Sequence, residues 1–178
     1  MPGKSFISFI TILIGLTLPV SAYSATVPGE VRKQISAPQK IGQVQVSFLG
    51  ISMYSATLFT QQGNAFAWAK PFALKLQYKR SFSRSRLVKA SISELERLEG
   101  KREDHAQIAQ KLHGCFRPVR KSDRFVAIAK SRNSLHFFFN GRKTCNIQHS
   151  GIRERVLGIW LSDRSRNAQL SRKLRGKN

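Results

Sequence analysis

The chain has 178 residues and a mass of 20.1 kDa, which is the size of one ordinary domain. Its 31 Lys and Arg residues against 9 Asp and Glu give a formal net charge of +22. Because 41% of the residues are hydrophobic and 10% are aromatic, this charge does not indicate a disordered polycation. The composition also excludes collagen-like, disulfide-dense and multi-pass membrane proteins.

The first residues have the pattern of a secretory signal peptide. Lys4 supplies the positive charge, and residues 6–20 form a nearly continuous apolar run. The small residues around Ser21 and Ala22 predict cleavage after Ala22. The alternative is a transmembrane anchor, which usually needs about 20 apolar residues. Since this run is shorter and ends in small polar residues, we expect residues 1–22 to be a signal peptide and the protein to be exported, either periplasmic or secreted.

Export changes the meaning of the positive charge. A cytosolic protein with this charge would first suggest a nucleic-acid partner, whereas an exported one meets anionic lipid headgroups and acidic polymers. No segment combines evenly spaced aromatic and basic residues as a base-stacking surface does, so the sequence does not favour nucleic acid. Two alternatives stay open: an anionic envelope surface as partner, or a solvated basic surface that serves solubility.

The chain has two cysteines, Cys115 and Cys145, and carries no familiar catalytic motif. In an oxidising compartment the two residues are disulfide candidates, with buried free thiols as the alternative. No second Cys or His stands at the spacing of a zinc site. The sequence also has no Gly-rich phosphate loop, GxSxG or HExxH motif. We therefore expect neither a metal nor a cofactor.

Hydrophobic periodicity predicts an α+β domain. Residues 23–40 are polar and contain two prolines, which predicts an extended N-terminal lead. Period-two alternation and turn residues then predict strands over 43–48, 52–60, 72–78, 124–130, 135–140 and 143–147. Helical periodicity predicts helices over 83–99, 104–113, 152–160 and 167–174. This order of elements favours a largely antiparallel sheet with the helices gathered on one face.

Two of these strands carry candidate binding residues. The alternation in 72–78 continues to Arg80, which predicts an arginine at the rim of an apolar surface. Tyr78 on this strand and Tyr54 on the preceding one are expected to bring two hydroxyl groups into an apolar pocket, with simple core packing as the alternative.

The same regions carry a resemblance to a known family. The segments that carry it occur in order along residues 41–176: 46–59 (VSFLGISMYSATLF), 68–80 (WAKPFALKLQYKR), 121–124 (KSDR), 137–141 (FFFNG) and 158–161 (GIWL). Together they resemble bacterial chalcone isomerase-like proteins. The last segment contains Trp160 and is the most specific of the five. The resemblance implies an open-faced β-sandwich over 41–178, with a long antiparallel sheet, a helical layer on one face and a ligand cleft between them.

The resemblance does not by itself imply catalysis. Plant chalcone isomerases hold a phenolate with an arginine on the first long strand, and residues 41–48 contain no arginine. Relatives in the superfamily include fatty-acid-binding proteins, which keep the cleft without the chemistry. The family usually has a small residue where Cys145 stands, and a cysteine there favours a bridge to Cys115.

We therefore expect an exported, non-catalytic protein that binds a small amphipathic ligand such as a fatty acid. Tyr54, Tyr78, Arg80 and Trp160 are the candidate ligand-binding residues, with Arg80 placed to receive a carboxylate. Two alternatives stay open. One is an isomerase acting on a chalcone-like or unsaturated carbonyl compound, which needs a replacement cation in the cleft. The other is a basic protein that adheres to anionic envelope surfaces.

Overall fold

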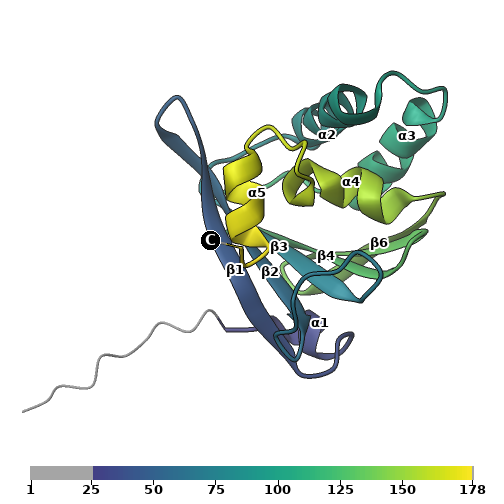
Figure 1. The fold of residues 1–178 in the computed structure, drawn as a ribbon. Helices are drawn as coiled ribbons and strands as arrows, with labels where there is room; N and C mark the ends of the chain where they lie inside the picture. Colours follow the sequence, from purple (N-terminus) through teal and green to yellow (C-terminus); the bar gives the residue numbers. More distant parts are fainter. Residues whose placement is uncertain (1–25, 178) are drawn as a thin grey trace, which may run out of the picture.

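The computed structural model describes residues 26–177, so the predicted signal peptide lies outside the described residues. Six antiparallel strands form one sheet whose spatial order follows the chain. They are β1 (Pro38–Phe48), β2 (Ile51–Gln61), β3 (Phe72–Tyr78), β4 (Arg124–Ser131), β5 (Ser134–Phe139) and β6 (Arg142–Gln148). The helices are α1 (Gly29–Arg32), α2 (Arg84–Glu99), α3 (His105–Cys115), α4 (Ile152–Leu161) and α5 (Ala168–Leu174). Helices α2 to α5 lie over one face of the sheet (Figure 1), which confirms the predicted α+β open-faced sandwich.

Local chemistry explains where the elements begin and end. Helix α2 begins after Ser83, whose hydroxyl accepts a hydrogen bond from the backbone N–H of Arg86, and it ends before Gly100. The β5–β6 hairpin turns at Asn140 and Gly141, whose φ angles of 48° and 86° are those that Asn and Gly tolerate best. Both boundaries agree with the sequence prediction.

The sheet has an apolar cluster on each face. The larger one, between the sheet and helices α2 to α5, includes Leu74 of β3, Ile108 of α3 and Leu157 of α4. The smaller one, on the other face, joins Val31 and Ile35 to residues of the central strands. The extended lead predicted over 23–40 is therefore wrong for residues 29–32, which form the helical turn α1. Val31 and Ile35 are four residues apart, so a helical turn directs both onto the sheet.

The C-terminal helix packs against the edge strand through a glycine. A Cβ atom at Gly42 of β1 would lie 2.1 Å from the carbonyl oxygen of Leu174 in α5. Glycine is thus required at this position by close approach of two backbones. The contact brings the end of the chain against the first strand, and α5 stands beside β1 in Figure 1.

One arginine joins three parts of the helical layer. Arg155 of α4 makes ion pairs of 2.6 Å with Glu99 at the end of α2 and with Asp104 just before α3. His105 and His149 add further hydrogen bonds to the same two carboxylates, at 2.8 and 2.9 Å. The side chain of Arg155 is only 10% exposed, so solvent screens these pairs less than ordinary surface pairs.

These contacts lower the pKa of both carboxyl groups. For Glu99, burial alone would raise the pKa, but hydrogen bonds from Arg155 and His105 outweigh burial and bring it below the ordinary 4.5. For Asp104, the hydrogen bonds from Arg155 and then from His149 hold the pKa well below the ordinary 3.8. Both groups therefore bind a proton more weakly in the folded state than in the unfolded state.

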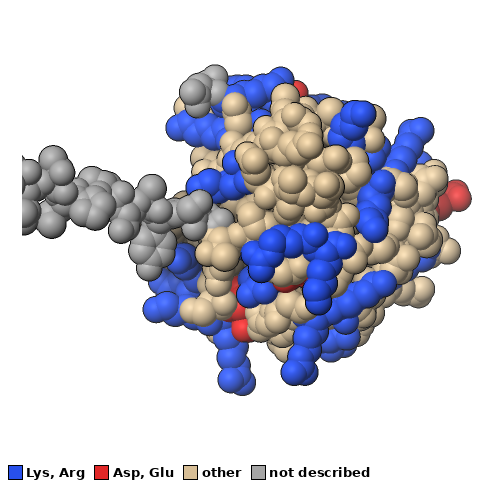
Figure 2. Space-filling model, turned by 90° about the horizontal axis from the view of Figure 1, so that it is seen from below, with Lys and Arg blue, Asp and Glu red and all other residues tan. Residues whose placement is uncertain are grey.

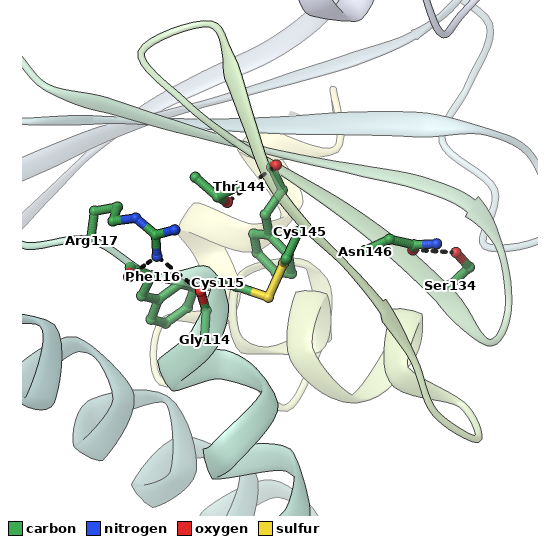
Figure 3. The surroundings of a disulfide bond; sticks show 9 residues. Gly114, Cys115, Phe116, Arg117, Ser134, Thr144, Cys145 and Asn146 are labelled. Atoms are coloured by element: carbon green, nitrogen blue, oxygen red, sulfur yellow. Dashed lines mark hydrogen bonds between the residues drawn. A yellow bond between two sulfur atoms is a disulfide. The ribbon is translucent and has the colours of Figure 1, made fainter.

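The disulfide between Cys115 and Cys145 ties the helical layer to the sheet. Cys115 ends α3 and Cys145 lies in β6, with their Cα atoms 5.2 Å apart (Figure 3). Of the two alternatives that the sequence left open, the structure has the bridge. Close to it, the guanidinium of Arg117 donates hydrogen bonds to the carbonyl oxygens of Gly114 and Phe116, both 2.9 Å long. The chain leaving α3 is thus held close to the bridge.

We predict that the ion pairs of Arg155 make stability depend on acid pH. A carboxyl whose folded pKa is depressed contributes stability that is complete above about pH 5 and is lost as the pH falls through and below its ordinary pKa. Thermal unfolding followed by circular dichroism from pH 7 to pH 3 should show a smaller drop in Tm for Arg155→Met than for the wild type, from a lower starting value. Arg142→Met is the control, because Arg142 is exposed and makes no ion pair among residues 26–177. Equal pH dependence of wild type and Arg155→Met would contradict the prediction.

We predict that reducing the disulfide lowers stability by about 3 to 4 kcal/mol, because the bridge closes a long loop in the unfolded chain. The two cysteines are 30 residues apart. Chemical unfolding of the Cys115→Ser/Cys145→Ser double variant measures the loss, and addition of a reductant to this variant should change nothing further. Two titratable thiols in the non-reduced wild type would contradict the assignment.

Candidate functional site

A cavity of about 400 Å³ lies between the sheet and the helices α2 and α4. Apolar side chains form most of its wall. The sheet contributes Met53, Leu74, Leu76, Phe125, Ala127 and Phe137, and the helices contribute Leu87, Val156, Leu157 and Ile159. The volume falls in the range of small-molecule sites.

The alternation of the strands explains this wall. Leu74 and Leu76 are two residues apart on β3 and point to the same face of the sheet. Their partners across β4, Ala127 and Phe125, point to that face as well, because residues directly opposite in an antiparallel pair share a face. The small side chain of Ala127 leaves space in the floor where its neighbours are large.

Two tyrosines and one tryptophan place polar atoms in the cavity. Tyr54 and Tyr78 are directly opposite on β2 and β3, with ring centroids 5.9 Å apart. The indole N–H of Trp160 in α4 donates a hydrogen bond of 2.9 Å to the hydroxyl oxygen of Tyr54. Three of the four residues expected at the site, Tyr54, Tyr78 and Trp160, therefore line one cavity.

Both tyrosine hydroxyls are neutral hydrogen-bond donors at neutral pH. Burial raises the pKa of Tyr54, partly offset by the hydrogen bond from Trp160. Burial also raises the pKa of Tyr78 well above its ordinary value of 10.0, with a smaller contribution from Tyr54. Tyr78 lines the cavity, and its hydroxyl takes no part in the side-chain hydrogen bonds found among the described residues, whereas that of Tyr54 accepts one from Trp160. The Tyr78 hydroxyl is therefore free to bind a polar atom of a ligand.

Arg80, expected at the rim of an apolar surface and named as a candidate ligand-binding residue, is not part of the cavity wall. Strand β3 ends at Tyr78, and Arg80 follows it as an exposed residue that does not line the cavity. The alternation of side chains needs continued strand geometry, which stops two residues earlier.

A different arginine, Arg86, reaches the cavity from α2. Its guanidinium carbon lies 5.8 Å from the ring centre of Phe82. The ring centres of Phe82 and Tyr78 are in turn 6.0 Å apart. Arg86, Ala90 and Glu94 recur every four residues on α2 and all line the cavity. This four-residue spacing is the sequence signal for a second inward-facing stripe on α2, beside the apolar stripe through Leu87 and Leu95, and the sequence prediction did not include it.

Glu94, the other charged residue of the wall, already has partners. Its carboxylate makes ion pairs with Arg97, at 2.9 Å, and with Arg166. Burial alone would raise the pKa of Glu94, but these arginines outweigh it and bring the pKa below the ordinary 4.5. Arg86 is the remaining charge on the wall of the cavity as the described residues form it.

The exposed sheet face is basic. Figure 2 views the molecule from the side of α1, and there the Lys and Arg side chains far outnumber the acidic ones. Lys75 on this side has a pKa lowered by partial burial and then by the nearby Arg124. Arg124 itself pairs with the buried Glu30, with 3.2 Å between guanidinium nitrogen and carboxylate oxygen.

No metal site is formed within residues 26–177, since no group of three or more His, Cys, Asp and Glu side chains is arranged to hold an ion. The helices in this same range are too short or too polar to cross a membrane.

Comparisons with known proteins agree with this architecture. Residues 47–176 match the family model of chalcone isomerase-like proteins. The structure is similar to that of a fatty-acid binding protein from Arabidopsis thaliana, with a TM-score of 0.62 and 10% sequence identity over 79% of this chain and 87% of that one. At this identity the similarity concerns the fold. The comparison with curated proteins gives no match. Since the family model covers well over half of the sequence, the chain belongs to the chalcone isomerase-like family.

Proposed function

We propose that this protein is an exported, non-catalytic carrier that binds a small amphipathic molecule, such as a fatty acid, in the cavity between the sheet and α2 and α4. The observation that carries the proposal is the cavity itself, which has about 400 Å³ of space, an apolar wall and a few polar groups. The similar fold of a fatty-acid binding protein supports the ligand class. Export is supported by the pattern of residues 1–22 and by the disulfide, since such bridges persist in oxidising compartments.

The positions of the polar groups suggest how the ligand is oriented. An ionised carboxylate placed deep in the cavity would need a cation, and within the described wall Arg86 is the cation. Arg86 is exposed, so it stands where the cavity meets solvent. We therefore infer that the acidic head lies at Arg86 and the acyl chain lies among Leu74, Ala127 and Leu157. The Tyr54 and Tyr78 hydroxyls suit a neutral carbonyl or hydroxyl group further inside.

The positions of the polar and charged groups in the cavity also favour ligand binding over catalysis. Stabilising a phenolate or enolate requires a preorganised donor or cation at the developing charge. Strand β1 supplies no arginine from Ile41 to Phe48, and Arg80 lies outside the cavity. Turnover of a chalcone by the wild type that disappears when the cavity is filled would support the isomerase alternative instead.

We predict that filling the cavity abolishes ligand binding. Ala127→Phe places a ring in the space above the floor of the sheet and should weaken dodecanoate binding at least tenfold, because the wall cannot give way without lost packing. Isothermal titration calorimetry measures the affinity, and circular dichroism checks that the variant is folded. The control is Ala106→Phe, since Ala106 is exposed on α3. Unchanged dodecanoate affinity in a folded Ala127→Phe protein would refute the proposed site.

We predict that Arg86 distinguishes acids from alcohols. Arg86→Gln should weaken dodecanoate binding about two- to fivefold, the effect of an exposed ion pair, and leave dodecanol binding unchanged. Lys89→Gln is the matched control, because Lys89 is an exposed basic residue of α2 that does not line the cavity. Equal losses for the acid and the alcohol would show that Arg86 does not contact the head group.

A further inference from the structure

The tip of the β1–β2 hairpin exposes large apolar side chains. Phe48, Leu49 and Ile51 are 65%, 85% and 45% exposed, and they are the exposed large hydrophobics of the described residues. The hairpin projects past the rest of the sheet at the side of α5 in Figure 1. A contiguous exposed apolar group of this kind marks a binding surface or an aggregation hazard.

Leucine is an unusual residue for the backbone conformation at the tip. Leu49 and Gly50 have φ angles of 48° and 74°, the pattern of a two-residue type I′ turn. The β5–β6 hairpin of the same chain has nearly the same angles, 48° and 86°, and uses Asn140 and Gly141. Asparagine tolerates a positive φ, whereas a branched apolar side chain is disfavoured there. Leu49 is thus unfavourable for both the turn and its exposure to water, so the folded chain alone gives no reason for it.

Basic residues stand beside this tip. The backbone N–H of Lys79 donates a hydrogen bond of 2.8 Å to the carbonyl oxygen of Met53, so the connection from β3 to α2 begins alongside the hairpin. We call residues 79–89 the basic rim, because this segment contains five Lys and Arg residues and no Asp or Glu. Lys79, Arg80 and Arg86 are exposed. The tip and the basic rim each contribute to the cavity wall, because Phe48 of the tip and Arg86 of the rim both line the cavity.

We propose that the hairpin tip inserts into the headgroup region of an anionic phospholipid bilayer, while the basic rim contacts the lipid phosphates. Stable attachment at a membrane surface combines apolar insertion with attraction between basic residues and anionic lipids, and both elements are adjacent here. A second copy of the chain does not fit the tip equally well, because each copy is strongly basic, with a formal net charge of +22 over the full sequence, and has a like-charged rim beside the contact. In this position the cavity faces the lipid, which is the source of an acyl ligand. That last step rests on the proposed carrier function.

The test measures co-sedimentation with vesicles of 70% phosphatidylcholine and 30% phosphatidylglycerol, and with vesicles of phosphatidylcholine alone. The wild type should bind the anionic vesicles at least tenfold more tightly than the neutral ones. Leu49→Asn removes the apolar group and restores the turn residue used at Asn140, so it should lose at least fivefold in vesicle affinity with an unchanged or higher Tm. Gln62→Asn is the matched control, because Gln62 has a φ of 56° in the turn at the other end of β2.

The contribution of the rim is tested separately. Lys79→Gln/Arg80→Gln should weaken binding to the anionic vesicles about tenfold or more, since each basic residue near such a surface adds attraction. Lys130→Gln/Arg132→Gln removes the same charge at the opposite end of the sheet, where β4 ends and β5 begins, and should bind as the wild type does.

Three results would overturn the proposal. They are an absence of wild-type binding to anionic vesicles, undiminished binding by Leu49→Asn, and a wild-type dimer that Leu49→Asn dissociates, which would assign the tip to a second copy. Membrane binding and the carrier function can be tested independently of each other. Ala127→Phe should lose dodecanoate binding and keep vesicle binding, whereas Leu49→Asn should keep dodecanoate binding from solution.

Discussion

The cavity depends on a helical layer that is anchored at its margins. Arg155 links the end of α2, the start of α3 and the middle of α4 through Glu99 and Asp104. The disulfide from Cys115 holds the other end of α3 to the sheet. Because these attachments are polar or covalent and lie at the edges, the apolar side chains between α2, α4 and the sheet do not have to close completely. An interior held only by hydrophobic contacts would gain stability by collapsing into such a space.

The neutral and the charged polar groups of the cavity lie at different depths, and this limits its chemistry. Neutral hydroxyls, those of Tyr54 and Tyr78, lie inside, where burial raises their pKa values. Arg86, a charged residue of the described wall, stands at the exposed edge. Among the described residues this arrangement offers no interior cation for a developing anion, and it suits the proposed ligand, a molecule with an apolar body and an acidic end. It supports the proposed carrier over the alternative of an isomerase on the same fold.

Leu49 at the hairpin tip differs from the residues at the same position in two other turns of the chain. Three two-residue turns place a non-glycine residue at positive φ just before a glycine: Leu49, Gln62 and Asn140. Asn140 also bonds to the backbone of Arg124 and to Asp123, so its side chain contributes to the fold. Leu49 is the most exposed of the large apolar residues described. With the same backbone geometry, the turn at Asn140 thus has a side chain that contributes to the fold, whereas the turn at Leu49 has one that is exposed to solvent.

Sequence patterns alone determined the strands, the four longer helices and the order of elements, because apolar periodicity and turn residues such as Asn140 and Gly141 act locally. They also placed Tyr54 and Tyr78 on neighbouring strands, because the period-two alternation that predicts each strand is a local pattern. Tertiary structure decided which arginine reaches the cavity. Arg80 lies past the end of β3, and Arg86 reaches the cavity through the orientation of α2. It likewise decided the turn at 29–32 and the pairing of Glu99 with Arg155, which are 56 residues apart. Contacts between distant segments depend on how the helices pack on the sheet, and no local pattern encodes that packing.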